Sequence, residues 1–198
     1  MPVRPVPRET RERLERFAQL VLAENARQNL IAASTAADFW NRHIVDSLQL
    51  LDHAPASRRL WLDIGSGAGL PGLVVAIASA HRVVLVEPRR RRAGFLTQCC
   101  EQLGLLDVVV EQRRVETLRI AADVISARAV ASLDTLFGWA GQIGSGGALM
   151  ILPRGVNAVS ELEAARAAWH GDFDLVPSVT ATGSGIVLAQ HVRRRETQ

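Results

Sequence analysis

A glycine-rich segment that follows an apolar run contains the residues best suited to chemistry. The run ends at Ile64, and four glycines follow within eight positions: Gly65, Gly67, Gly69 and Gly72. Glycine lets the main chain approach a ligand closely and adopt torsion angles that other residues avoid, and Pro71 suits the first turn of a helix. A tight turn alone needs fewer glycines, so the segment predicts a ligand-binding loop between a strand and a helix.

Two carboxylates narrow the type of ligand. Asp63 lies near the end of the first apolar run, and Glu87 directly follows the second. A carboxylate at that place can accept two hydrogen bonds from a ribose diol, so Glu87 indicates an adenosine-containing cofactor. The pattern is compatible with a nicotinamide dinucleotide as well as with S-adenosylmethionine, because the segment from Gly67 to Gly72 also satisfies the dinucleotide fingerprint.

The absence of two residue types from the sequence separates these classes. The chain contains neither tyrosine nor lysine, so the tyrosine and lysine pair of short-chain dehydrogenases cannot exist here. The loop then resembles the one with which S-adenosylmethionine-dependent methyltransferases hold their cofactor. Its candidate contacts are Asp63, Gly65, Ser66, Gly67, Gly69, Leu70 and Glu87.

The order of apolar runs predicts the sheet that positions this loop. Five runs alternate with helix-length segments, as in a parallel sheet with crossover helices: Leu60–Ile64, Val83–Val86, Val108–Val110, Val124–Ser126 and Ala148–Leu152. We expect a tight turn from Gly144 to Gly147. Two last runs, Phe173–Val179 and Gly185–Val192, flank Thr182 to Ser184 and predict an antiparallel terminal hairpin.

Two amphipathic segments precede the first strand. Apolar residues recur at helical spacing from Arg8 to about Asn29, and a second helix is expected around Asp38 to Leu51 with Asp38 as its cap. We predict one domain over residues 1–198, with an N-terminal helical extension (1–55) and a cofactor-binding α/β core (58–198). The expected fold is the doubly wound, Rossmann-like fold of class I S-adenosylmethionine-dependent methyltransferases, with a seven-stranded, mostly parallel sheet.

The charge of the chain neither establishes nor excludes a nucleic-acid partner. All 23 basic residues are arginine, and the formal net charge of +3 is too small to prove nucleic-acid binding. Arginines cluster at Arg89–Arg92, at Arg113 and Arg114, and at Arg193–Arg195; each cluster suits either a phosphate backbone or a solvated surface. The adjacent Cys99 and Cys100 are expected to be reduced thiols. No apolar stretch is long enough to span a bilayer, so we expect a cytoplasmic protein. We also expect a monomer without a metal site.

Four segments carry a more specific resemblance. They are Asn29–Ala32, Arg42–Leu48, Gly69–Gly72 and Ser126–Leu133. In this order they resemble the ribosomal RNA small-subunit methyltransferase G family, also called glucose-inhibited division protein B, across nearly the whole chain. The resemblance implies transfer of a methyl group from S-adenosylmethionine to N7 of a specific guanine in 16S ribosomal RNA, either naked or in an assembling subunit.

The resemblance also implies roles for individual residues. Gly65 and Leu70 would contact the cofactor, and Val115 and Glu116 would hold its adenine, although Glu116 also suits the first turn of a helix. Arg128 would lie beside the methionine part and the incoming RNA, as a candidate catalytic residue. A second candidate is Arg154, where the family usually has lysine; arginine keeps the charge but is a planar fork.

The expected chemistry needs no catalytic base. Guanine N7 carries an in-plane lone pair, so its attack needs alignment more than proton removal. The fourth run ends in Ser126-Ala127-Arg128-Ala129, not in the Asn/Asp-Pro-Pro-aromatic tetrapeptide of amine methyltransferases, and no cysteine follows a proline there.

Several alternatives stay open at this point. His43, Asp46 and Ser47 share a helix face and form either a polar cluster near the cofactor or anchors for the N-terminal helices. The rival functions are an NAD-binding oxidoreductase, a non-catalytic RNA-binding protein of the same fold, and a methyltransferase for a small molecule.

Overall fold

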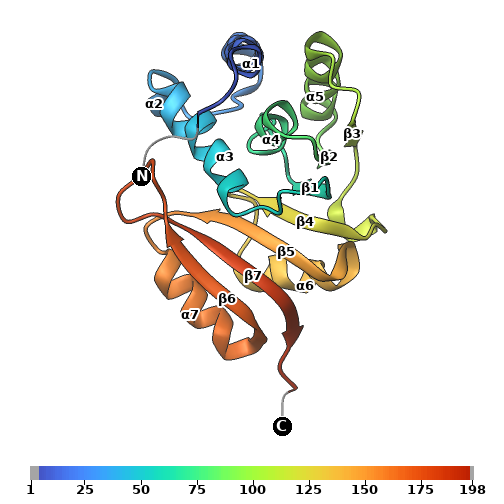
Figure 1. Cartoon of the computed structure of the whole chain (residues 1–198), viewed down its shortest axis with the longest axis vertical. Helices are drawn as coiled ribbons and strands as arrows, with labels where there is room; N and C mark the ends of the chain where they lie inside the picture. The colour runs from blue at the N-terminus through green and yellow to red at the C-terminus, as the bar shows by residue number, and fades with distance from the viewer. Residues whose placement is uncertain (1–4, 197–198) are drawn as a thin grey trace.

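The centre of the molecule is a seven-stranded sheet. The computed structural model describes residues 5–196. The strands are β1 Leu60–Ile64, β2 Arg82–Val86, β3 Val108–Glu111, β4 Ala122–Ala127, β5 Gly144–Arg154, β6 Trp169–Pro177 and β7 Gly185–Arg194. They are arranged in the order β3-β2-β1-β4-β5-β7-β6, with the first five parallel and β7 antiparallel to both β5 and β6 (Figure 1). The predicted doubly wound fold with its antiparallel hairpin is confirmed.

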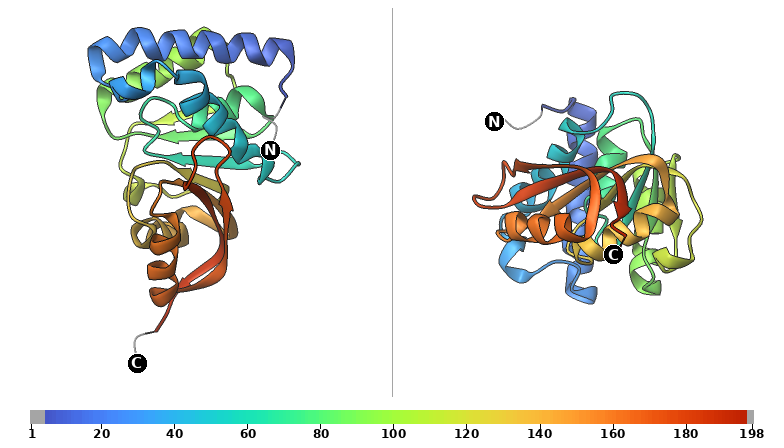
Figure 2. Two further views of the ribbon diagram at one scale, coloured as in Figure 1. Left: turned by 90° about the vertical axis from the view of Figure 1, so that its left-hand side faces the viewer. Right: turned by 90° about the horizontal axis from the view of Figure 1, so that it is seen from below.

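Helices cover both faces of the sheet because strand residues alternate between two cores. Trp61, Val83 and Val124 pack on one face with the helices α1 (Arg8–Gln28), α4 (Gly72–Ala78) and α5 (Arg90–Leu103). Their neighbours Leu62, Val84 and Ile125 pack on the other face with α6 (Leu133–Ile143) and α7 (Ala158–Ala168). Figure 2 shows the helices on either side of the twisted sheet.

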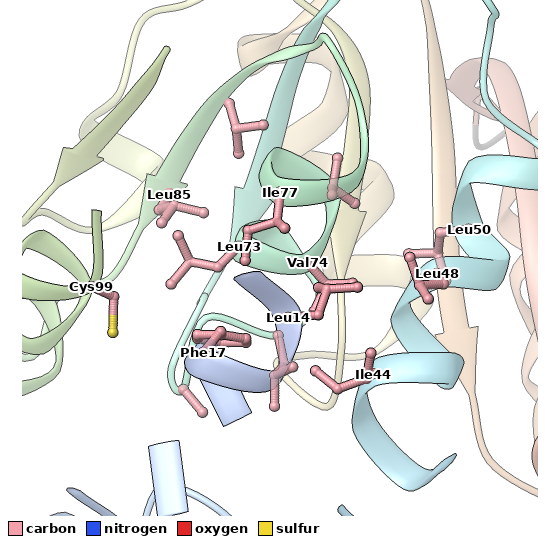
Figure 3. Close-up of a cluster of buried hydrophobic side chains, with 14 of the residues drawn as sticks. Leu14, Phe17, Ile44, Leu48, Leu50, Leu73, Val74, Ile77, Leu85 and Cys99 are labelled. Atoms are coloured by element: carbon pink, nitrogen blue, oxygen red, sulfur yellow. The ribbon is translucent and has the colours of Figure 1, made fainter. Parts of the chain in front are cut away.

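The N-terminal helices belong to the first of these cores. Leu14 and Phe17 of α1 are fully buried and lie beside Leu73 and Val74 of α4, as Figure 3 shows. Ile44 enters the same cluster from a π-helical segment, η1 (Trp40–Val45). The N-terminal segment is therefore part of the packed body.

The second helical segment differs in detail from the prediction. A short helix, α2 (Ala33–Ala36), comes first, and η1 continues without a break into α3 (Asp46–Leu48) and a 3-10 turn, η2 (Gln49–Asp52). Asp38 directly precedes the helical residues, but its carboxylate accepts a hydrogen bond from the Asn41 side chain at 2.8 Å and not from a backbone N–H, so it does not cap the helix as predicted.

The residues from Gly144 to Gly147, predicted as a turn that leads into the fifth strand, form an irregularity at the start of that strand instead. The residues belong to the start of β5, where Gly144 pairs with Ala122 before the register shifts. The register shift brings Gly144 close to Ala148: a Cβ atom on Gly144 would lie 2.8 Å from the Cβ of Ala148, so this position requires glycine. None of the helices in residues 5–196 combines the length and apolar character needed to cross a membrane.

Candidate functional site

The glycine loop joins β1 to α4 at the carboxyl edge of the sheet. Gly65 and Gly67 have φ angles of +65° and +55°, which favour glycine. A Cβ on Gly65 would lie 2.6 Å from a methyl of Val130, the residue two positions beyond Arg128. The loop can therefore lie close to the segment that follows β4, at the point where the strand order reverses between β1 and β4.

Glu87 holds the loop in this conformation. Its carboxylate accepts hydrogen bonds from the backbone N–H of Gly67 at 3.0 Å and of Arg89 at 2.8 Å. Only 3% of the residue is exposed. One hydrogen bond to each oxygen leaves further lone pairs, so the carboxylate can also accept hydrogen bonds from a ribose diol.

Asp63 supports the loop from behind. It is fully buried and accepts hydrogen bonds from the Ser126 hydroxyl at 2.6 Å and from the backbone N–H of Gly72 at 3.2 Å. Burial raises the pKa of the Asp63 carboxyl to about 6, even though these hydrogen bonds favour the charged form. Asp63 therefore ties β1, β4 and the start of α4 together.

These elements enclose a pocket of about 820 Å³, which we call the cofactor pocket. Eight predicted site residues line it: Gly65, Ser66, Gly67, Leu70, Glu87, Val115, Glu116 and Arg128. Asp63 and Gly69 do not line it, because Asp63 lies beneath the loop and Gly69 packs against Leu73. Val115 and Glu116 come from a 3-10 turn, η3 (Val115–Thr117), after β3.

Sequence reasoning missed some residues of the cofactor pocket. Leu30 and Ile31 line it from the segment after α1, and Trp139 lines it from α6. Arg89, Arg92 and Arg114 also line it, so parts of two arginine clusters lie at this site. Arg194 and Arg195 lie near the far end of β7, where Arg194 pairs with Asp134 and Arg195 donates to the Arg166 carbonyl.

A second pocket of about 380 Å³ lies beside the first; we call it the acceptor-side pocket. Its charged and polar lining residues come from several segments and include Arg42, Asp46, Arg128, Arg154, Glu161 and Thr180. Arg128 and Ala129 line both pockets. Ala129 has a φ of +55°, which strains a non-glycine residue, and such strain is typical of functional sites.

Both predicted catalytic arginines lie in the acceptor-side pocket and are held by side chains. Arg128 donates to Asp46 Oδ2 at 3.1 Å and approaches His43 Nδ1 at 3.3 Å. Arg154 donates to Glu161 Oε2 at 2.7 Å and to the Ala131 carbonyl at 3.0 Å. His43 and Asp46 thus lie beside Arg128, whereas Ser47 is buried and donates back to the His43 carbonyl.

The cysteines lie outside both pockets. Burial raises the pKa of the Cys99 thiol to about 12 and that of Cys100 to about 11, so both are protonated at neutral pH. A cysteine nucleophile therefore plays no part at this site.

The fold is the one that class I methyltransferases have. A SAM-dependent methyltransferase from Aquifex aeolicus has a TM-score of 0.62 at 13% identity, over 82% of this chain and 95% of that chain. TYW2 from M. jannaschii, solved in complex with AdoMet, has a TM-score of 0.58 at 13% identity, over 77% of this chain and 76% of that one. Identities this low show the fold alone.

The family follows from sequence similarity. Residues 10–187 match the family described as rRNA small subunit methyltransferase G. Ribosomal RNA small subunit methyltransferase G of Rhizorhabdus wittichii is 47% identical over 96% of this chain and 89% of its own length. The same enzyme of Zymomonas mobilis is 43% identical over 96% of this chain and 90% of its own length. The chain belongs to this family, and it is a methyltransferase that uses S-adenosylmethionine.

Proposed function

We propose that the chain transfers the methyl group of S-adenosylmethionine to N7 of a specific guanine in 16S ribosomal RNA. The observation that carries the proposal is the meeting of two pockets at Arg128, one shaped by a glycine loop and one lined by arginines. Membership of the rRNA small subunit methyltransferase G family supports the acceptor. We also propose that one chain, as a single domain, acts as a monomer in the cytoplasm, since residues of one chain line both pockets.

The cofactor pocket fits an adenosine cofactor. Glu87 is proposed to bind the ribose hydroxyls, because its carboxylate keeps lone pairs beyond those used by Gly67 and Arg89. Val115 and Glu116 are proposed to flank the adenine, and Gly65, Ser66, Gly67 and Leu70 to form the wall that the cofactor contacts. Asp63 and Gly69 are proposed to act indirectly, by holding the loop.

The acceptor-side pocket is proposed to receive the guanine. Arg128 stands at the wall that both pockets share, so its guanidinium can donate to the incoming nucleotide close to the cofactor. Arg154 and the exposed Arg42 can meet RNA phosphates at the same pocket. Together they position the base.

The reaction that this arrangement suits is a direct displacement. S-adenosylmethionine would supply an electrophilic methyl group. The N7 lone pair would form the new bond as the sulfur–methyl bond breaks, so the positive charge would pass from sulfur to the purine and neutral S-adenosylhomocysteine would leave. No proton is transferred, so the residues need only align the base and exclude water. His43 does not serve as a base, because the Arg128 guanidinium faces its Nδ1 atom and Thr35 faces its Nε2 atom.

The test is transfer of labelled methyl from S-adenosylmethionine to 16S ribosomal RNA and to small subunits that lack the modification, followed by mapping of the labelled base. We expect label on a guanine N7, and comparison of the two substrates identifies the form that the enzyme uses. Absence of transfer to either, despite demonstrated cofactor binding, would contradict the proposed acceptor.

A further inference from the structure

Arg128 is held by two acceptors that the N-terminal segment provides. Its Nη1 atom lies 3.1 Å from Asp46 Oδ2, and its Nη2 atom lies 3.3 Å from His43 Nδ1. The Arg128 and Asp46 side chains are only 20% and 18% exposed, so solvent screens their charges weakly. The guanidinium is therefore oriented before any ligand binds.

His43 adds an acceptor without adding a charge. The Thr35 hydroxyl donates to the Ala32 carbonyl at 2.9 Å, so its oxygen accepts from Nε2–H of His43 at 2.9 Å. This assigns the proton to Nε2 and leaves the lone pair of Nδ1 for Arg128. Burial, and then the charge of Arg128, lower the pKa of His43 to about 4, despite the opposing effects of Asp46 and Asp38.

Asp46 is fixed on its other side by the loop between β6 and β7. The Thr180 hydroxyl donates to Asp46 Oδ1 at 2.6 Å, and Gln49 Nε2 donates to the same oxygen at 2.9 Å. Gln49 also accepts from the backbone N–H of Val179 at 3.0 Å. Asp46 is thus a rigid anion, and it is the carboxylate with which Arg128 forms its ion pair within residues 5–196.

Charge balance matters at this position because Arg128 lines the cofactor pocket as well. The sulfonium of S-adenosylmethionine is a cation, and N7-methylguanine takes up that positive charge in the product. An uncompensated guanidinium on the shared wall would repel both, whereas an ion pair with no net charge repels neither.

We propose that Asp46 is a positioning and charge-compensating residue, which holds Arg128 together with His43 and allows a cationic methyl donor to bind beside an arginine. The inference rests on the proposed function for the identity of the methyl donor. A merely structural Asp46, which only ties helix to loop, would affect every ligand of the cofactor pocket alike.

Two ligands that differ in one charge distinguish these roles. S-adenosylmethionine is a sulfonium cation, whereas S-adenosylhomocysteine has a neutral thioether and keeps the same adenosine and amino acid groups. We would measure the Kd of each by calorimetry, without RNA, for the full chain and its variants. Asp46→Asn should weaken S-adenosylmethionine about tenfold relative to S-adenosylhomocysteine, since the Arg128 charge then stands alone.

Three further variants control the experiment. Thr180→Val removes the same contact to the loop but keeps both charges, so the ratio of the two Kd values should stay that of the wild type. Arg128→Gln leaves Asp46 unpaired and should shift the ratio in the opposite direction, which keeps the inference testable if Asp46→Asn fails to fold. The double variant Asp46→Asn with Arg128→Gln should restore the ratio.

Equal losses for both ligands in Asp46→Asn, or an unchanged ratio in Arg128→Gln, would overturn the inference and leave the proposed function intact. A wild-type chain that binds neither ligand would instead contradict the proposed function.

Discussion

The two pockets that share Arg128 are built in different ways. The cofactor pocket takes one wall from consecutive loop residues, whose φ angles and backbone N–H groups create its shape, with Glu87 as their anchor. The acceptor-side pocket takes its walls from side chains of segments far apart in the chain, joined by ion pairs such as that of Arg154 with Glu161. Added volume in the glycine loop should therefore damage the first pocket most, and loss of a charged side chain should damage the second most.

Replacement of Arg128 should impair both pockets at once, because the residue lines both. Arg128→Ala removes the guanidinium and leaves the partly buried Asp46 charge unpaired, so we expect kcat/KM for methyl transfer to fall about a hundredfold to a thousandfold. Asp46 keeps its contacts to Thr180 and Gln49, so circular dichroism should show a folded protein. An unchanged rate would remove Arg128 from the site.

Added volume in the glycine loop should damage the cofactor pocket alone. Gly67→Val places a β-branched side chain at a φ of +55° in the pocket wall, and we expect cofactor affinity to fall about a hundredfold, measured by calorimetry.

A matched glycine on α5 provides the control for this variant. A Cβ on Gly94 meets nothing within 4 Å, so Gly94→Ala should raise the free energy of unfolding by about 0.5–1 kcal/mol and leave the affinity unchanged. Wild-type affinity in Gly67→Val would show that the pocket is misplaced.

Loss of Arg154 should affect the acceptor side alone. Arg154→Ala is expected to raise KM for the RNA about tenfold, because one phosphate or base contact is lost, while the Kd of S-adenosylmethionine stays the same. Arg154→Lys keeps the charge, so its KM for the RNA should lie between those of the wild type and Arg154→Ala. A rise in the cofactor Kd would show that the two pockets are not independent at this residue.

The smallest effect on turnover is expected from a change beneath the cofactor pocket, where the readout is stability. The folded pKa of Asp63 is about 6 and its ordinary value is 3.8, so the folded state binds more protons than the unfolded state between these values. Relative to Asp63→Asn, the wild-type free energy of unfolding should therefore fall as pH rises from about 4 to about 6, by at most about 3 kcal/mol. Urea titrations across this range measure it, and a difference that increases with pH would contradict the assigned burial.

The sequence made the cofactor side predictable because its signals are local. Glycines directly follow an apolar run, and Glu87 directly follows the next, so their place at the sheet edge comes from strand order. The contribution of Trp139 could not be predicted, since it depends on which face α6 turns toward the loop. The start of β5 at Gly144 was missed because glycines usually indicate a turn.

For the acceptor-side pocket, the sequence predicted individual residues but not the contacts between them. Family resemblance indicated Arg128 and Arg154, but not that His43 and Asp46 hold the first or that Glu161 holds the second. These contacts join segments that no periodicity connects. Helical spacing placed His43 and Asp46 on one face, and the tertiary packing decided what that face meets.

The hydrogen bonds from Asp46 and Gln49 to the loop between β6 and β7 also bear on when the acceptor-side pocket can form during synthesis of the chain. They join residues 134 and 130 positions apart in the chain. The residues that line the cofactor pocket all lie between Leu30 and Trp139, so a growing chain holds them well before Thr180 is made. The acceptor-side pocket can therefore be completed only when the loop between β6 and β7 has joined the N-terminal helices, after most of the polypeptide has left the ribosome.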